Sequence, residues 1–237
     1  MARRVLISAA LLSLFSSAVL FAEDPADRLS SLIQAKNWPK GLRVCKGIPG
    51  TESRRPDREQ LAASHFAGLA AHCAALASGA GDLWRSNWWW AIAAAMDVEA
   101  ARALLPRFQS RGLLLDLLPP RMHAYAESSE LLENQVRLPN GELVTGKRVR
   151  PRDPPRIPAY FFASTVPGVA RTQVKVGFVV DEEGQPWQPV LVGAQALPVH
   201  AFLAFAFVGE WRFFPAVVDG VPVASTYMIT VTVETKR

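Results

Sequence analysis

His65, His72 and Cys73 form the group of side chains that comes closest to a catalytic or metal site. The two histidines lie seven residues apart in one Ala-rich stretch, and the cysteine directly follows the second. Imidazole and thiolate are ligands that Zn²⁺ accepts, but no Asp or Glu at ligand spacing completes the set. Ser64 precedes His65 without the Gly-x-Ser-x-Gly turn of a nucleophilic serine, and no glycine-rich phosphate loop opens a helix. The sequence therefore predicts a protein that is not an enzyme and uses no metal or cofactor.

Residues 1–22 have the pattern of an export signal. Arg3 and Arg4 precede an apolar run over 5–22, and the acidic pair Glu23 and Asp24 follows it. Small residues near the end of the run favour cleavage. The run also approaches the roughly 20 residues that span a bilayer, so an uncleaved anchor is the alternative, and only that form would contact the membrane. The sequence predicts an exported chain, either released or tethered.

Cys45 and Cys73 are the two cysteines of the chain. In an oxidising compartment such a pair favours a disulfide, with two separate buried thiols as the alternative. A bridge that closes a loop of about 28 residues stabilises the fold by about 3 kcal/mol in the chain-entropy model. We expect the bridge to hold together a small helical domain.

The charge of the chain gives little indication of a polyanionic partner. Loss of Arg3 and Arg4 with the signal lowers the formal net charge of +5 by two. The basic residues gather in 147–156, which is either a solvated linker or a segment that contacts acidic lipid or an envelope polymer. Because no aromatic residues interleave with this run, we predict no nucleic-acid binding.

Residues 23–128 are rich in Ala and Leu at helical spacing and are predicted to be all-α. Expected helices cover 25–35, 38–45, 58–77, 84–96 and 98–108, with Asp97 as the N-cap of the last. Trp88, Trp89 and Trp90 point in different directions on a helix, which favours burial over an exposed binding surface. The array is faintly similar to tetratricopeptide-type helical hairpins, and an irregular helical domain is the alternative.

Residues 129–156 are predicted to be a hairpin followed by a linker. Asn140 and Gly141 lie between two alternating stretches, which is a strong hairpin signal. Four prolines in 151–158 then favour an extended connector. We place the start of a second domain at residue 157.

Residues 157–237 combine strand and helix patterns, so the whole chain is predicted to be α+β. The stretch 173–181 alternates, Gly184 permits a tight turn, and 185–192 returns as a second strand. An apolar stripe over 197–210 indicates a helix able to cover one sheet face. Trp211 and Phe213 are expected to enter the core with the last strand. In the run 225–236, Tyr227 and every second residue after it point inward, so a half-buried strand closes the chain.

This half of the sequence resembles the TonB C-terminal domain family. The resemblance covers about 80 residues and depends on three segments: 157–160, the strand and turn over 173–184, and an aromatic-Arg-aromatic-x-Pro element at 211–215 followed by a turn at 220–223. It implies a small antiparallel sheet packed with a helix. It also implies a periplasmic domain that grips an extended segment of an outer-membrane receptor by strand addition. An uncleaved signal would instead anchor the chain in the inner membrane, facing the periplasm.

These observations predict a periplasmic, non-enzymatic adapter whose terminal strand contacts an outer-membrane receptor or another envelope protein. The expected partner-binding residues are Tyr160, Thr226, Met228, Thr230, Thr232 and Glu234. The same strand permits a strand-paired homodimer. The alternative function is an envelope scaffold that binds its partner through the helical N-terminal array, with the C-terminal domain as a dimerisation or spacer unit.

Overall fold

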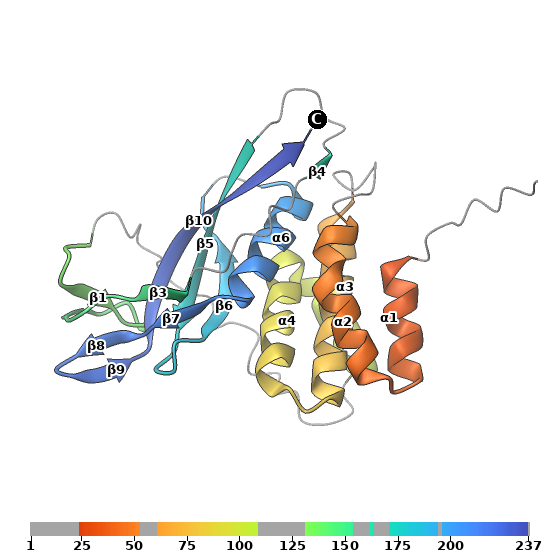
Figure 1. The fold of residues 1–237 in the computed structure, drawn as a ribbon, viewed down its shortest axis with the longest axis horizontal. Helices are drawn as coiled ribbons and strands as arrows, with labels where there is room; N and C mark the ends of the chain where they lie inside the picture. Colours follow the sequence, from red (N-terminus) through yellow and green to blue (C-terminus); the bar gives the residue numbers. More distant parts are fainter. Residues whose placement is uncertain are drawn as a thin grey trace, which may run out of the picture.

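The computed structural model describes residues 24–52, 61–108, 131–153, 162–163, 171–193 and 196–236. An N-terminal group of helices lies on one side of the central helix α6 (Pro198–Gly209), and a four-stranded sheet lies on the other (Figure 1). Strands and helices are thus segregated along the chain, and small antiparallel sheets pack with a helix. The predicted α+β class is confirmed.

The N-terminal region contains five helices close to the predicted positions. They are α1 (Pro25–Gln34), α2 (Trp38–Glu52), α3 (Ala63–Gly79), α4 (Leu83–Met96) and α5 (Val98–Phe108). Asp24 caps α1 by accepting a hydrogen bond from the Ala26 N–H at 2.8 Å, and Asp97 caps α5 by accepting one from the Ala100 N–H at 3.0 Å. Helix α2 extends beyond its predicted end at Cys45, because Ile48, one turn later, is buried on the same side.

The predicted disulfide joins Cys45 of α2 to Cys73 of α3, with 5.7 Å between the Cα atoms. Both cysteines are buried in the core. The bridge fits an oxidising compartment. No helix within the described ranges is long and apolar enough to cross a membrane.

The three consecutive tryptophans of α4 are all buried, as the core interpretation predicted. Trp88, Trp89 and Trp90 are between 3% and 8% exposed. Their different directions are accommodated because α4 contacts α3, α5, α6 and strand β6 (Pro186–Leu191) at once. Helix α4 therefore connects the helical region with the sheet.

The main sheet has the strand order β4-β10-β5-β6, where β4 is Phe162–Ala163, β5 is Arg171–Val180 and β10 is Ser225–Lys236. The antiparallel hairpin β5–β6 was predicted and is present. Its turn depends on Asp181, whose Oδ1 accepts hydrogen bonds from the N–H groups of Glu183 and Gln185 at 3.0 and 2.7 Å. Gly184 has φ +81° and lies against the Phe213 backbone, so a side chain there would be both strained and obstructed.

Three two-stranded ribbons complete the β structure of the described residues. β1 (Gln135–Arg137) pairs with β2 (Leu143–Thr145), β3 (Arg150–Asp153) with β7 (Arg212–Phe214), and β8 (Ala216–Val218) with β9 (Val221–Val223). The first is the hairpin predicted around Asn140 and Gly141. Phe213 is buried and Trp211 is half-buried, but they lie at β7 rather than on the last strand. Pro215 separates β7 from β8 because it has no N–H to continue a ladder.

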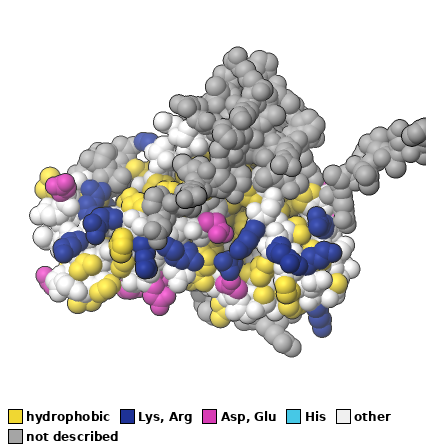
Figure 2. Space-filling view, in the orientation of Figure 1, with side chains coloured by type: hydrophobic (Ala, Val, Ile, Leu, Met, Phe, Trp, Pro, Cys, Tyr) yellow, Lys and Arg dark blue, Asp and Glu magenta, His cyan; other side chains and the backbone are white. Residues whose placement is uncertain are grey.

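Part of the predicted linker is also ordered as a strand. Arg150 and Arg152 of β3 are exposed, and their guanidinium carbons lie 5.6 and 5.8 Å from the centre of the Phe214 ring on β7. Cation–π contact of this kind holds the basic run on the surface. Figure 2 shows Lys and Arg side chains in a band across this face of the molecule, with Asp and Glu side chains among and below them.

Helix α6 differs from its prediction as a one-faced amphipathic helix. Ten of its twelve residues, on all of its faces, are buried. It contacts α2, α3 and α4 on one side and β5, β6 and β10 on the other. A helix that is apolar all round is stable only when it is enclosed in this way. Phe66 of α3 and Trp89 of α4 both contact the ring of Phe202, with centroids 5.2 and 6.0 Å apart.

The contact between α6 and α4 predicts that Gly209→Ala will destabilise the fold. A Cβ at Gly209 would overlap the indole ring of Trp88, so one of the two helices must move. We expect a loss of about 1–3 kcal/mol in the free energy of unfolding. Gly47→Ala is the matched control, because a Cβ at this helical glycine meets nothing within 4 Å. Urea unfolding followed by circular dichroism would measure both, and equal effects would contradict the close packing.

Candidate functional site

The candidate site is one edge of strand β10. On one side, β5 pairs with residues 225–234 without interruption. On the other side, β4 pairs only with Thr235 and Lys236. At the far edge of the sheet, α4 packs against β6. Residues 227–234, which we call the open edge, therefore have no strand beside them on the side away from β5 within the part of the chain that the structure describes. This length corresponds to roughly 26 Å of extended chain.

The start of the open edge is marked by β1. The Thr226 hydroxyl donates a hydrogen bond to the carbonyl oxygen of Arg137, 3.3 Å away. Only after this residue does the outer side of the strand lack a neighbour among the described residues. Thr226 was predicted to bind the partner, but its hydroxyl already makes this hydrogen bond within the chain.

The hydrogen bonds of the sheet identify which backbone groups of β10 point outward. The Val192 N–H donates to the Lys175 carbonyl at 3.0 Å, so Lys175 directs its polar backbone groups toward β6. In an antiparallel ladder these directions alternate, so Val174 and Val176 direct theirs toward β10. Their partners on β10 are Val231 and Ile229. The odd-numbered residues of β10 thus pair with β5, and the even-numbered ones face the open edge.

The side chains of β10 follow the predicted alternation. Tyr227, Ile229, Val231 and Val233 lie opposite Phe178, Val176, Val174 and Thr172 on the side of the sheet that α6 covers. Met228, Thr230 and Thr232 point away from the helix, and the two threonines are exposed. The residues whose backbone groups face the open edge are therefore the same ones that present side chains to the outer face of the sheet.

Apart from Thr226, the predicted site residues divide into three groups. Met228, Thr230 and Thr232 lie together along the open edge, and their role in partner binding stays a prediction. Glu234 also lies on β10, and its side chain is outside the described residues. Tyr160 lies outside the described residues altogether.

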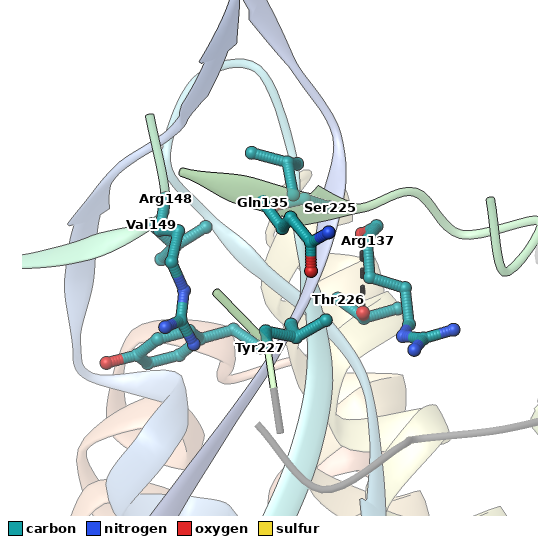
Figure 3. A pocket seen from close by; sticks show the side chains of 9 residues that line it. Gln135, Arg137, Arg148, Val149, Ser225, Thr226 and Tyr227 are labelled. Atoms are coloured by element: carbon teal, nitrogen blue, oxygen red, sulfur yellow. Dashed lines mark hydrogen bonds between the residues drawn. The ribbon is translucent and has the colours of Figure 1, made fainter. Parts of the chain in front are cut away.

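A small pocket at the start of β10 was not predicted from the sequence. The side chains of Gln135, Arg137, Arg148, Ser225, Thr226 and Tyr227 line it, with Arg148 and Arg137 on opposite sides of it (Figure 3). Nothing in the sequence links its two halves, since they are separated by almost 80 residues. The fold brings them together because β1 contacts β10.

Tyr227 connects this pocket with the core. Its ring contacts those of Phe178 and Phe213 with centroids 5.7 Å apart in both cases. Burial raises the pKa of the Tyr227 phenol above its ordinary value of 10.0, and the positive charge of Arg148 opposes that shift. The phenol is therefore uncharged at neutral pH.

The residues considered for metal binding have other contacts. Cys73 is in the disulfide. The Nδ1 atom of His72 lies 2.7 Å from the Gly68 carbonyl oxygen one turn earlier in α3, and the ring of His65 lies edge-on to Phe66. Within the described ranges, no three His, Cys, Asp or Glu side chains are placed to hold a metal ion.

Comparisons of this chain with protein-family models, with curated proteins and with solved structures found no match.

A pair of proline substitutions tests which residues of β10 direct their backbone N–H groups toward the open edge. Thr230→Pro removes an N–H that faces the open edge, so the free energy of unfolding should stay within about 1 kcal/mol of the parent protein. Val231→Pro removes an N–H that pairs with β5 and should cost at least about 2 kcal/mol. Urea unfolding of both variants gives the answer. A larger loss of unfolding free energy in Thr230→Pro than in Val231→Pro would show that the backbone N–H groups of the odd-numbered residues face the open edge.

The pKa of Tyr227 predicts a loss of stability at high pH. Because the folded-state pKa is raised, the native state holds its proton more tightly than the unfolded state. Stability is then unaffected below the unfolded value of 10.0 and falls as the pH rises from there through the folded pKa. Tyr227→Phe should flatten this decline. Unfolding free energies compared between pH 9 and 11.5 would show it, and parallel curves for the two proteins would contradict the assignment.

Proposed function

We propose that this protein binds another protein of the cell envelope by accepting an extended segment of it as an additional strand along the open edge of β10. The observation that carries the proposal is the row of outward-facing backbone groups at 227–234, beside which the described residues place no strand. Such groups form main-chain hydrogen bonds with a guest strand. Thr230 and Thr232 would then lie next to the guest side chains.

The pairing of β4 supports this proposal. Phe162 and Ala163 lie parallel to β10 beside Thr235 and Lys236, on the same side as the open edge. The edge therefore already accepts a strand at its far end. A guest would continue the sheet toward β1, in the space between β4 and Thr226.

The resemblance to the TonB C-terminal domain family gives the proposal its setting. Strands β10, β5 and β6 form the small antiparallel sheet that the resemblance implies, and α6 packs against it, although the short strands β7, β8 and β9 separate α6 from β10 along the chain. A buried disulfide is in keeping with an exported protein. On this basis we propose that the protein works in the periplasm and that its partner is an outer-membrane receptor.

The alternative, a scaffold that binds through its helices, has less support. The helical region uses much of its apolar surface against α6 and β6. Among its described residues, Leu83 and Val98 are the exposed large hydrophobic side chains. Residues 227–234 of β10, by contrast, have no described strand beside them on the side away from β5.

Site-specific photocrosslinking in cells tests strand addition directly. A photoreactive residue at Met228, on the open edge, should capture a second protein that mass spectrometry identifies. Adding Thr230→Pro should reduce capture about tenfold or more, because the main-chain donor is lost, whereas Thr230→Ala, which keeps the N–H, should leave it unchanged. Point substitutions are preferable to truncation because the two halves of the chain share the core around α6.

The matched control carries the photoreactive residue at Gln173, which is exposed on β5. Equal capture from Gln173 and Met228, or capture that survives Thr230→Pro, would contradict strand addition. Capture of a second copy of the same chain would indicate a strand-paired dimer instead of a receptor complex.

A further inference from the structure

The pocket beside Thr226 lies directly at the start of the open edge. Thr226 belongs to the outer face of β10, whereas Ser225 and Tyr227 belong to the face that α6 covers. A pocket lined by residues from both faces must wrap around an edge of the strand. Since β5 occupies the other edge over 225–234, the pocket is on the side of the open edge. We call it the corner pocket.

The corner pocket is lined by hydrogen-bond donors and positive charge. Of the nine described residues that line it, two are arginines and none is Asp or Glu. Gln135 uses its carbonyl oxygen to accept from the Leu132 N–H at 3.3 Å, which leaves its amide N–H groups as donors. Arg137 donates through Nη1 to the Gly141 carbonyl, and its Nε–H is buried without an acceptor. In Figure 3, Arg148 reaches down toward Tyr227 on the other side of the pocket.

Ser225 is the clearest sign that this pocket can bind a polar group. The residue is 1% exposed, and its hydroxyl has no hydrogen-bond partner. A buried hydroxyl left without a partner is unfavourable, and native structures usually satisfy it. The cavity measures about 20 Å³, which has room for one water molecule or one oxygen atom of a larger group that enters from the edge. The surrounding charges favour an oxygen that carries negative charge.

We infer that the corner pocket binds a carboxylate of the guest segment, with one carboxylate oxygen accepting from Ser225 and the group held between Arg148 and Arg137. For its ligand this inference rests on the proposed strand addition. A carboxylate can be the C-terminus of the guest or an Asp or Glu side chain within it. A C-terminus at this corner requires the guest to run antiparallel to β10, because the end of an antiparallel strand lies beside the start of its neighbour.

The first test needs no guest. Sodium acetate is titrated into the ¹⁵N-labelled full chain at constant ionic strength, with sodium chloride as the reference, and backbone amide shifts are followed by NMR. We expect saturable shifts at Ser225, Thr226 and Val149 in the millimolar range, with about tenfold weaker binding in Ser225→Ala and Arg148→Gln. Ser225→Ala removes only a hydroxyl without a partner, so this variant should fold normally.

Arg152→Gln is the matched control, since this exposed arginine contacts Phe214 and does not line the pocket. Acetate binding should be unchanged in it. Shifts that do not saturate, that chloride reproduces, or that persist in both pocket variants would overturn the inference.

The second test identifies the source of the carboxylate. An eight-residue peptide that alternates Thr and Val, with a fluorophore at its N-terminus, is prepared as the free acid, as the C-terminal amide, and as the amide with Glu in last place. In fluorescence anisotropy the free acid should bind about tenfold more tightly than the plain amide, and Ser225→Ala should remove the difference. Equally tight binding of the Glu peptide would show that a side chain suffices.

The two proposals fail in different ways. If all three peptides bind equally and Thr230→Pro abolishes their binding, strand addition stands and the carboxylate inference is overturned. If the free acid keeps its advantage and Thr230→Pro has no effect, the pocket binds a carboxylate and strand addition along β10 is overturned.

Discussion

The burial of α6 on both of its faces is the constraint on which the rest of the structure depends. The helix is apolar all round, so it must be covered by the sheet on one side and by α2, α3 and α4 on the other. Close approach to α4 is possible because Gly209 has no side chain in front of Trp88. The two halves of the chain, different as they are in composition, therefore share one core.

This arrangement also determines which part of the sheet is left for a partner. Helix α6 covers one face, and α4 packs against β6 at one edge. The opposite edge belongs to β10, the last strand, which β4 touches only at Thr235 and Lys236. The ladder with β5 then decides that the even-numbered residues of β10 direct their N–H and C=O groups outward. A buried scaffold thus positions a row of backbone groups beside which the described part of the chain places no strand.

The corner pocket makes one end of the open edge chemically different from the other. Backbone hydrogen bonds alone are nearly independent of sequence, so strand addition by itself discriminates poorly between guests. A cluster of donors at one end of the edge, which includes the buried hydroxyl of Ser225, would favour a guest with a negative charge at that position. In the proposed complex, β10 supplies most of the contact length and the corner pocket fixes register and orientation.

The sequence by itself determined the local elements. Asp97 at a helix start, Asn140 with Gly141, the turn at Gly184 and the alternation after Tyr227 all act within a few residues, and each is found where it was predicted. The tertiary structure alone decided the full burial of α6, the separate ribbon at Phe213, the open edge of β10 as the described residues leave it, and the assembly of Arg148 with Ser225. These features depend on contacts between segments far apart in the chain, because burial and strand neighbours are properties of the packed fold rather than of a local pattern.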